Sequence, residues 1–489
     1  MLQSILLCDF YKAVHKDMYD LSITKIVSYY TPRKSRFKDI QEIPIVGLQS
    51  FIIKYLVYGF NENFFNIPLK EIIAQYIDVI SQTMGVDRIN VDKIIQLHNL
   101  GYLPLEINAI EEGICVPIGT PMIEITNTHS NFAWCVNAIE SLLSSEMWYQ
   151  SCTAIVGKSY REIANAFYDD TVMDTTKARH AISEFGFRGL PGMDAAIKAS
   201  MGFLMSFDRT ATIPAIHEIS SYYGDELSEI GGGMASTEHS IMTSSYAIDG
   251  NEETLFKRLI TQVYPTGNLS IVCDSYDYWK IIKEMAPKYK NEICSRKGTI
   301  FFRGDSGDPV EIVTETVYEL YAIFGGYING KGYRVLNDHV RVIYGDAITQ
   351  LRARQIYQIL KDTGYSAENV VLGAGSFSMI CYMNDDGTLN PYTRDSFSVA
   401  IKSTYIETST SSFNIFKDPI TDTDKFKKSQ KGCCVVYKDN NGIHHLDGYT
   451  YTNARLHEDN LLKPLFKNGE FLRTTTFNEI RNRFWNGQF

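Results

Sequence analysis

Four charged residues stand directly after short apolar runs of the chain: Asp274, Arg303, Asp305 and Asp346. A single aspartate in such a place is most often the N-cap of the next helix. Four such residues on successive strands are expected to lie together, because the carboxyl ends of parallel strands share one face of a sheet. Clustered carboxylates and an arginine suit sugar hydroxyls, Mg²⁺ and a polyanion. The sequence therefore predicts a site of this chemistry.

A histidine, His239, stands behind three glycines at 231–233 and beside Glu238. It could simply begin a helix, with Ser236 or Thr237 as the N-cap. That interpretation leaves the glycines and the carboxylate unexplained. A histidine whose tautomer is fixed by a carboxylate is also a nucleophile, so His239 is a candidate catalytic residue.

Two short motifs could bind an aromatic ring and a phosphate. Phe185 lies in EFGFRG (184–189), with glycines nearby and Arg188 close behind. A phenylalanine is more often part of the core, but an exposed ring between turns could stack on a planar substrate. GAGS (373–376) lacks the third glycine of a dinucleotide fingerprint. It is either a tight turn or a set of backbone amides for a phosphate.

Basic residues recur towards the end of this acidic chain: Arg394, Lys402, Lys417, Lys425, Lys427, Lys428 and Lys431. Such runs usually belong to solvated loops. Arg394 and Lys402 instead flank an apolar stretch, which favours a phosphate site.

Composition limits the class of protein. The chain has 489 residues, 44% of them hydrophobic and 21% charged, which is ordinary for a globular enzyme. A net charge of −10 argues against nucleic acid as the main partner. The nine cysteines include no C-x-x-C pair, which favours free thiols in a reducing compartment. We find no signal peptide and no apolar window of about 18 residues, so we expect a cytoplasmic protein without a membrane span.

Periodicity divides the chain into three parts. Residues 103–128 alternate like short antiparallel strands, and residues 131–167 have a helical pattern. Between about 178 and 376, apolar strands alternate with amphipathic helices, which predicts a parallel sheet. Residues 381–395 are expected to form a loop. Short strands return at CCVVYKD and HHLDGYTYT. We expect an α/β barrel over 151–385 and a second, β-rich domain made from 1–150 and 386–489.

These motifs together resemble one family, the nicotinamide phosphoribosyltransferases. The resemblance covers nearly the whole chain in collinear order. It rests on LLCDFYKAVHK (6–16), VGLQSFI (46–52), FGFRG (185–189), STEHS (236–240), CDSYD (273–277), RGDSGDP (303–309), YGD (344–346), TRD (393–395), IKST (401–404) and FKDP (416–419).

The resemblance implies an irregular α/β barrel of the type II phosphoribosyltransferases and a homodimer with two shared active sites. It also implies a reaction in which nicotinamide and 5-phosphoribosyl 1-pyrophosphate give nicotinamide mononucleotide and pyrophosphate. Mg²⁺ is the implied cofactor. ATP is implied as a phosphoryl donor to His239, with Asp274 orienting the imidazole.

The resemblance also implies roles for individual residues. Phe185 and the partner's Tyr11 would enclose the pyridine ring, and Arg303 would bind its carbonyl oxygen, with Ala211 and Ser270 in the same pocket. Asp305 and Asp346 would hold the ribose, and Asp274 with Asp305 would hold the metal. The phosphate and pyrophosphate groups would be bound by Arg188, the partner's Arg33, Gly373, Gly375, Arg394, Lys402, Lys417 and Lys425.

The chain departs from the family pattern in the base pocket and in one loop. Ala211 stands where the family has an aspartate that accepts the carboxamide N–H, and Asp208 is a candidate substitute. Ser183-Glu184 replaces His-Asp, and Gly233 replaces a serine. Residues 378–391 form a longer loop than usual. These departures leave open the use of nicotinate, or of a larger donor such as ADP-ribose pyrophosphate, which would give NAD directly.

Two other classes of protein fit the sequence less well. A non-catalytic metabolite-binding relative would have little reason to keep all five of His239, Asp274, Arg303, Asp305 and Asp346. A histidine-phosphorylating kinase or phosphatase would explain His239 but not the residues for pyridine and ribose.

Overall fold

The computed structural model describes residues 2–85, 89–345, 347–383, 388–423 and 427–487. The chain forms two compact units. Unit 1 comprises Met1–Cys152, Glu218–Asp225 and Tyr392–Phe489, and unit 2 comprises Thr153–His217 and Glu226–Pro391. The expected domain boundaries were 150 and 385. The short segment Glu218–Asp225 of unit 1 has no counterpart in that expectation.

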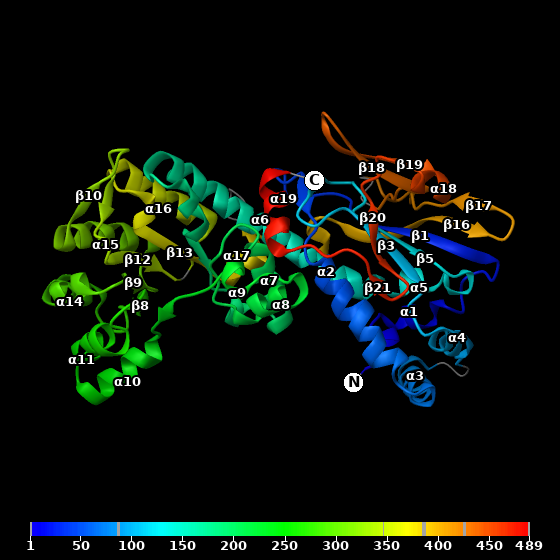
Figure 1. Cartoon of the computed structure of the whole chain (residues 1–489), viewed down its shortest axis with the longest axis horizontal. Coiled ribbons are helices and arrows are strands. Elements are labelled where there is room, and N and C mark those ends of the chain that lie inside the picture. Colours follow the sequence, from blue (N-terminus) through cyan, green and yellow to red (C-terminus); the bar gives the residue numbers. More distant parts are fainter. Residues whose placement is uncertain (1, 86–88, 346, 384–387, 424–426, 488–489) are drawn as a thin grey trace. The chain divides into compact units, whose positions relative to one another are not determined.

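Unit 1 is built on a seven-stranded antiparallel sheet in the order β17-β16-β1-β5-β3-β20-β21 (Figure 1). Its strands come from both ends of the chain: β1 (Ile23–Pro32), β3 (Leu105–Ala109), β5 (Ile123–Asn127), β16 (Val399–Thr408), β17 (Ser412–Asn414), β20 (Lys463–Lys467) and β21 (Glu470–Phe471). Two antiparallel pairs accompany the sheet: β2 (Glu42–Pro44) with β4 (Cys115–Pro117), and β18 (Cys433–Asp439) with β19 (Gly442–Tyr449). The expected β-rich domain from the N- and C-terminal parts is present.

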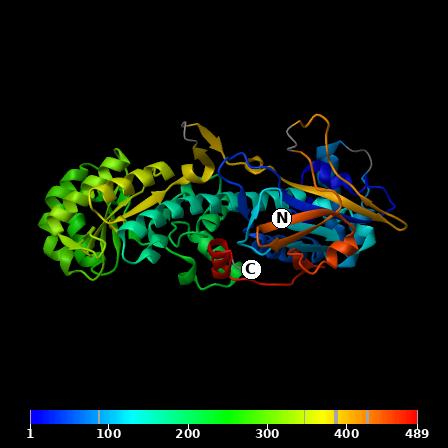
Figure 2. The ribbon, with the colours of Figure 1, turned by 90° about the horizontal axis from the view of Figure 1, so that it is seen from above.

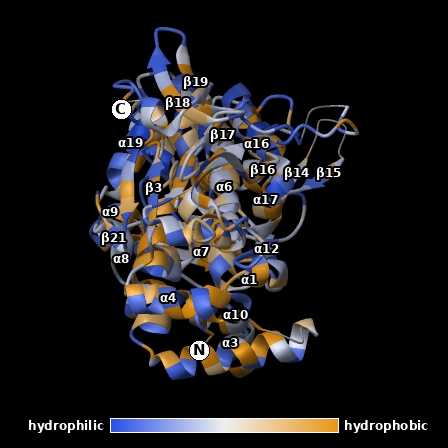
Figure 3. Cartoon of the chain, turned by 90° about the vertical axis from the view of Figure 1, so that its right-hand side faces the viewer, coloured by the Kyte–Doolittle hydropathy of each residue, from blue (hydrophilic) through white to orange (hydrophobic). Residues whose placement is uncertain are grey.

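The helices of unit 1 are amphipathic. In α3 (Leu69–Met84), Ile72, Tyr76 and Ile80 are buried, four residues apart, so they share one face. Hydrophobic and hydrophilic residues accordingly alternate along α3 in Figure 3. The other helices of this unit are α1 (Phe10–His15), α2 (Leu48–Phe51), α4 (Asp92–Leu100), α5 (Cys135–Ala138), α18 (Tyr451–Arg455) and α19 (Phe477–Asn486). The division between the units falls within α6 (Glu140–Thr171) and α8 (Ile213–Tyr223).

Unit 2 contains a six-stranded parallel sheet in the order β6-β13-β12-β9-β8-β7. The strands are β6 (Ile182–Glu184), β7 (Ala235–Ser236), β8 (Leu269–Val272), β9 (Ile300–Gly304), β12 (Val340–Tyr344) and β13 (Val370–Ala374). Those predicted from the apolar runs at 269, 298, 340 and 369 are β8, β9, β12 and β13. They are largely buried, as their continuous apolar pattern requires.

Single backbone bridges connect the two edges of this sheet. Glu184 of β6 pairs in parallel with Thr210, and the neighbouring Arg209 pairs with Gly232, just before β7. Hydrogen bonds from the Ala211 N–H to the Glu184 oxygen (2.9 Å) and from the Thr210 N–H to the Gly232 oxygen (3.2 Å) support these bridges. The strands therefore curl round into an irregular barrel, as predicted.

Helices surround the strands of unit 2 in both views of the ribbon (Figure 1 and Figure 2). They are α7 (Met193–Phe203), α9 (Leu227–Ile230), α10 (His239–Asp249), α11 (Glu253–Arg258), α12 (Tyr278–Lys280), α13 (Ala286–Lys288), α14 (Lys290–Ser295), α15 (Pro309–Phe324), α16 (Gln350–Asp362) and α17 (Ser376–Ile380). An antiparallel pair, β10 (Gly326–Ile328) and β11 (Arg334–Leu336), follows α15.

One prediction of a loop was wrong. Within residues 381–395, β14 (Cys381–Met383) pairs antiparallel with β15 (Leu389–Pro391). Asn, Asp, Gly and Pro in this segment indicated a loop, but Asn390 and Pro391 belong to β15 and pair with Tyr382 and Cys381.

Two further expectations concern the whole chain. All nine cysteines are free thiols. In the part of the chain that the structure describes, no helix is both long and apolar enough to cross a membrane.

Candidate active site

The aspartates predicted at the strand ends are distinct from those that cap helices. Asp277 caps α12 by accepting from the Lys280 N–H (3.0 Å), and Asp308 caps α15 by accepting from two backbone N–H groups. Asp274 and Asp305 each lie three residues earlier, at the ends of β8 and β9. The N-cap explanation therefore applies to their neighbours. The carboxylate of Asp274 instead binds the loop after β9, and that of Asp305 pairs with Arg303.

Two hydrogen bonds fix the carboxylate of Asp274, and one of its oxygens has no hydrogen-bond partner among the described residues. Its Oδ2 accepts from the Asp305 N–H (3.1 Å) and from the Ser306 hydroxyl (2.6 Å). Its side chain is only 5% exposed, and Oδ1 is buried without a hydrogen-bond partner among the described residues. A buried unpaired carboxylate oxygen is costly, so this atom is a strong candidate to contact a ligand.

Arg303 and Asp305 form a bidentate ion pair. Nε of Arg303 donates to Oδ1 of Asp305 (2.9 Å), and Nη2 lies 2.7 Å from Oδ2. Both side chains are less than one-fifth exposed, so water screens the pair only weakly. A side chain at Gly345 would collide with this pair, since a Cβ there would lie 2.5 Å from Asp305 Oδ1. The glycine after β12 thus makes room for the ion pair.

His239 lies at the start of α10 beside both carboxylates. Its Nε2 is 3.9 Å from Asp274 Oδ1 and 3.8 Å from Asp305 Oδ2, while Nδ1 is within hydrogen-bond distance of the Ser275 hydroxyl (3.1 Å). The imidazole is half exposed. Glu238 is the N-cap residue but makes no side-chain cap, so neither Ser236 nor Thr237 has that place. The histidine is therefore positioned by β8 and β9 as well as by its own helix.

These three side chains could hold a divalent cation. One ligand atom from each of His239, Asp274 and Asp305 lies within 4.8 Å of the others. Mg²⁺ prefers oxygen and is usually bound by one or two carboxylates together with substrate phosphates. The unpaired Oδ1 of Asp274 and the carboxylate of Asp305 fit that requirement. The imidazole suits it less well.

Phe185 presents its ring next to Arg303. The guanidinium carbon is 5.9 Å from the centre of the ring, within the usual cation–π limit. One edge of the ring packs on Gly373, where a Cβ would lie 2.5 Å from Phe185 Cδ2 and 2.8 Å from Cε2. Gly373, expected to bind phosphate, therefore supports the aromatic ring. Gly375 has open space where its Cβ would be and precedes α17, so a ligand could approach its backbone.

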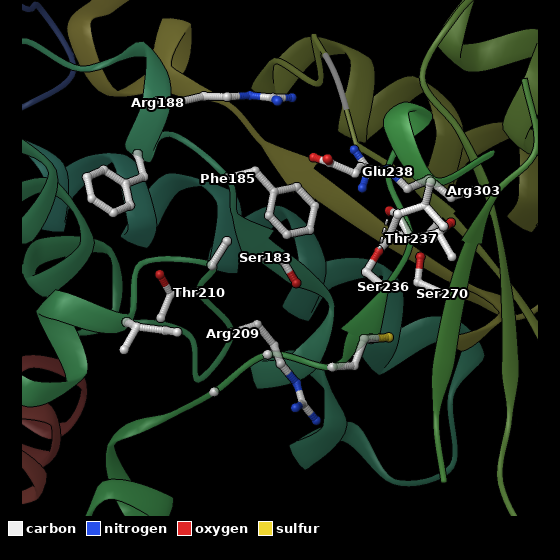
Figure 4. Close-up of a pocket in the computed structure, with 18 residues that line it drawn as sticks. Ser183, Phe185, Arg188, Arg209, Thr210, Ser236, Thr237, Glu238, Ser270 and Arg303 are labelled. Atoms are coloured by element: carbon white, nitrogen blue, oxygen red, sulfur yellow. Dashed lines mark hydrogen bonds between the residues drawn. The ribbon is translucent and has the colours of Figure 1, made fainter. Parts of the chain in front are cut away.

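A cavity of about 940 Å³ runs along the inside of the barrel (Figure 4). Its lining includes Phe185, Arg188, Ala211, Ser270 and Arg303, all predicted from the sequence. Barrels of parallel strands usually fill their interior with bulky branched residues. Here the inward positions carry small residues, including Ser183, Ser236, Gly232 and Gly233. The interior therefore stays hollow and is large enough for a ring substrate with additional groups.

Glu184 holds the wall of this cavity from behind. It is fully buried and accepts from the hydroxyls of Ser200, Thr210 and Thr212 (2.7–3.0 Å) and from the N–H of Gly186. Each of these contacts ties β6 to a neighbouring segment. Because the carboxylate is satisfied in this way, it acts on the cavity only by positioning the wall.

Asp208 does not replace the missing aspartate of the base pocket. It is absent from the cavity lining, and its carboxylate accepts from His180 Nδ1 (2.6 Å) and pairs with Arg179 Nε (3.0 Å). Burial raises the pKa of Asp208, but the hydrogen bond from His180 and the charges of Arg209 and Arg179 outweigh it, so the pKa lies below its ordinary value. The anionic group is therefore committed elsewhere.

Four of the cations expected to bind phosphate form a cluster within unit 1, namely Arg33, Arg394, Lys402 and Lys417. Burial lowers the pKa of Lys402, and the charges of Arg33, Lys12 and Lys417 act in the same direction, against Glu140, which lies 3.7 Å away. Burial also lowers the pKa of Arg33, and Arg394 adds to that effect. Several cations this close together repel each other, which favours binding of an anion.

The remaining predicted residues divide into two groups. Tyr11 is more than half exposed, with its hydroxyl donating to Asp9 (3.2 Å). Asp346 and Lys425 lie outside the described residues.

Sequence reasoning missed Arg209, which lines the cavity. The signal was its place two residues before Ala211, a predicted residue of the same pocket.

Comparisons with known proteins agree with this geometry. The sequence profile of the Nicotinate phosphoribosyltransferase (NAPRTase) family matches residues 180–470. A protein of Acinetobacter baylyi named nicotinamide phosphoribosyltransferase is 34% identical over 97% of this chain and 95% of its own length. A protein of the same name from Xanthomonas campestris is 30% identical over 78% of this chain and 79% of its own.

Solved structures support the fold. The nicotinate-nucleotide pyrophosphorylase of Pyrococcus furiosus aligns with a TM-score of 0.57 at 14% identity, covering 99% of this chain and 94% of its own. Human nicotinic acid phosphoribosyltransferase aligns with a TM-score of 0.57 at 13% identity, covering 98% and 93%.

These structures share the fold of the chain, an irregular α/β barrel. The relatives from Acinetobacter and Xanthomonas identify the chain as a pentosyltransferase. More narrowly, the matched profile and the 34% identity show that the chain belongs to the nicotinate phosphoribosyltransferase family.

Proposed function

We propose that this protein joins nicotinamide to 5-phosphoribosyl 1-pyrophosphate, giving nicotinamide mononucleotide and pyrophosphate, as part of NAD biosynthesis. The names of its relatives in Acinetobacter and Xanthomonas support the choice of nicotinamide. The single observation that carries the proposal is the meeting of Phe185, Arg303 and the two carboxylates of Asp274 and Asp305 at one end of the hollow barrel.

The chemistry needs little from a general base. The lone pair of the pyridine nitrogen forms a bond to the anomeric carbon, and the bond from that carbon to the pyrophosphate oxygen breaks, with its electrons leaving on pyrophosphate. No proton has to move. The protein's task is to hold the ring in line and to stabilise the charges. Phe185 would stack on the ring, Arg303 would bind the carboxamide oxygen, and Asp305 would hold a ribose hydroxyl.

Asp274 and Asp305 are the residues that would hold Mg²⁺. When bound, the ion would neutralise the pyrophosphate group. The carboxylates also set the local charge, since without a cation they would repel an anionic donor. Arg188 in the cavity wall would add to the binding of the anion, and the cationic cluster of unit 1 is by itself a candidate site for phosphate.

We also propose a homodimer, in which the partner's Tyr11 covers the second face of the pyridine ring and the partner's Arg33 contacts phosphate. The exposure of Tyr11 and the cations that surround Arg33 within unit 1 support this arrangement.

The function is tested by identifying the product. We expect incubation with nicotinamide, 5-phosphoribosyl 1-pyrophosphate and Mg²⁺ to yield a product with the mass of nicotinamide mononucleotide. ADP-ribose pyrophosphate is offered as a competing donor, because an inserted hairpin, β14–β15, follows α17. Formation of NAD from that donor alone, or of no nucleotide from either donor, would overturn the proposal.

We further propose that ATP phosphorylates His239 and that turnover of the phosphohistidine improves the yield of product. Half of the imidazole surface is open to solvent, and Ser275 at Nδ1 leaves Nε2 to face the carboxylates. In His239→Ala, we expect the ratio of the rate with ATP to the rate without ATP to fall to about one, because the acceptor nitrogen is lost. Steady-state rates of both proteins measure this ratio. A variant that ATP still stimulates as strongly would place the effect of ATP elsewhere.

A further inference from the structure

Arg209 lies deeper in the barrel than the residues expected to contact the pyridine. The bridge between Glu184 and Thr210 puts Arg209 level with Ser183, and Phe185 is two residues further along β6. Arg209 and Ser183 both line the cavity. In Figure 4 the guanidinium of Arg209 is directed away from the ring of Phe185.

The charge of Arg209 is poorly compensated. Its Nε is 3.7 Å from Oδ1 of Asp208, beyond hydrogen-bond distance. Asp208 is already bound more closely by His180 and Arg179. Among the described residues, no acceptor lies within hydrogen-bond distance of this guanidinium, which is about one-third exposed. The side chain can therefore turn towards a ligand without breaking a hydrogen bond of its own.

A second polar group in the same cavity is also unpaired. Ser270 is 1% exposed, and its hydroxyl has no hydrogen-bond partner among the described residues. A buried hydroxyl without a partner costs free energy that a ligand's acceptor atom would recover.

The charges of the lining favour an anion. Its cationic side chains are Arg188, Arg209 and Arg303, and its single anionic side chain among the described residues is Glu238. Arg303 is neutralised by Asp305, whereas Arg209 is not neutralised in this way. At Ala211, where an acidic side chain would repel a carboxylate, the chain offers only a methyl group.

We propose that Arg209 and Ser270 form a carboxylate subsite in the base pocket, so that an aromatic ring carrying a carboxylate binds there at least as well as the matching amide. Arg209 is then a specificity-determining residue, because its fork of N–H donors can bind both oxygens of a carboxylate. The part of this inference that concerns turnover rests on the proposed function. The part that concerns binding of an aromatic acid requires only the cavity.

Binding without turnover gives the direct test. Benzoate and benzamide have the shape of nicotinate and nicotinamide but lack the reactive ring nitrogen. In calorimetric titrations of the full-length protein, we expect benzoate to bind at least as tightly as benzamide. Arg209→Gln should lower the affinity for benzoate about tenfold, equivalent to about 1.4 kcal/mol. Its affinity for benzamide should change less than about twofold. The benzoate affinity of Arg209→Lys should lie between those of the parent protein and Arg209→Gln, since lysine keeps the charge but not the fork of N–H donors.

Arg179→Gln is the matched control. This substitution removes the other arginine that pairs with Asp208, but Arg179 does not line the cavity. We expect this variant to keep the benzoate affinity of the parent protein. Equal weakening of both ligands in Arg209→Gln, loss of benzoate binding in Arg179→Gln, or failure of benzoate to bind the parent protein would each overturn the subsite.

Turnover separates this inference from the proposed function. With 5-phosphoribosyl 1-pyrophosphate as donor, the ratio of kcat/KM for nicotinate to that for nicotinamide should fall about tenfold in Arg209→Gln. If neither base reacts but benzoate still binds through Arg209, the proposed function fails and the subsite stands. If nicotinamide reacts but the ratio is unchanged in the variant, the function stands and the subsite is wrong.

Discussion

Arg303→Ala should lower kcat/KM for nicotinamide by about a thousandfold, the size of effect that follows loss of a preorganised charged donor in an active site. The guanidinium of Arg303 makes three contacts: two with the carboxylate of Asp305 and a cation–π contact with the ring of Phe185. Without the guanidinium, Asp305 keeps its charge at the edge of the cavity, close to Asp274 and His239. The site would then repel the pyrophosphate donor and lose its proposed donor to the carboxamide.

Arg303→Lys separates charge from geometry. A lysine keeps the positive charge but cannot bind Asp305 with two parallel donors, so an intermediate loss of about tenfold to a hundredfold is expected. Steady-state kinetics measure both variants, and the temperature of thermal unfolding checks that each is folded. Full activity of a folded Arg303→Ala protein would contradict the pocket assigned here.

The parallel sheet of unit 2 could be predicted from the periodicity because its strands are mostly apolar and its helices are amphipathic. β8, β9, β12 and β13 each have four or five residues that are mostly buried, which is long enough to stand out. The closure of this sheet into a barrel was predicted from the resemblance to the family and could not be predicted from the periodicity. It depends on the single bridges at Thr210 and Gly232, and one residue pair leaves no periodic pattern.

The site shows the same contrast. Polar residues at strand ends identified Asp274, Arg303 and Asp305, since parallel strands bring their carboxyl ends together. The importance of Gly345 and Gly373 depends on what lies opposite them, the ion pair and the Phe185 ring, and that contact is made only in three dimensions. Arg209 was hidden for a similar reason. Its neighbour Asp208 was the expected substitute in the base pocket, but the carboxylate of Asp208 binds His180 and does not line the cavity.

Asp274→Asn should raise the Mg²⁺ concentration needed for half-maximal activity about tenfold or more and lower kcat about a hundredfold. The substitution keeps the shape of the side chain, and the amide oxygen can still accept from the N–H of Asp305 and the hydroxyl of Ser306. The unpaired Oδ1 would become an NH₂ group that faces His239. A donor at that place cannot bind a cation, and half of the local negative charge is lost.

Asp277→Asn is the matched control for this change, since Asp277 lies in the same loop and caps α12 through a hydrogen bond to the Lys280 N–H. Asparagine caps a helix about as well as aspartate, so both stability and Mg²⁺ dependence should be preserved. Titration of activity against Mg²⁺ in the two variants distinguishes a metal-binding carboxylate from a general effect of charge. If Asp274→Asn showed the Mg²⁺ dependence of Asp277→Asn, the ion would have to be bound by other groups, and the buried Oδ1 would serve only to orient His239.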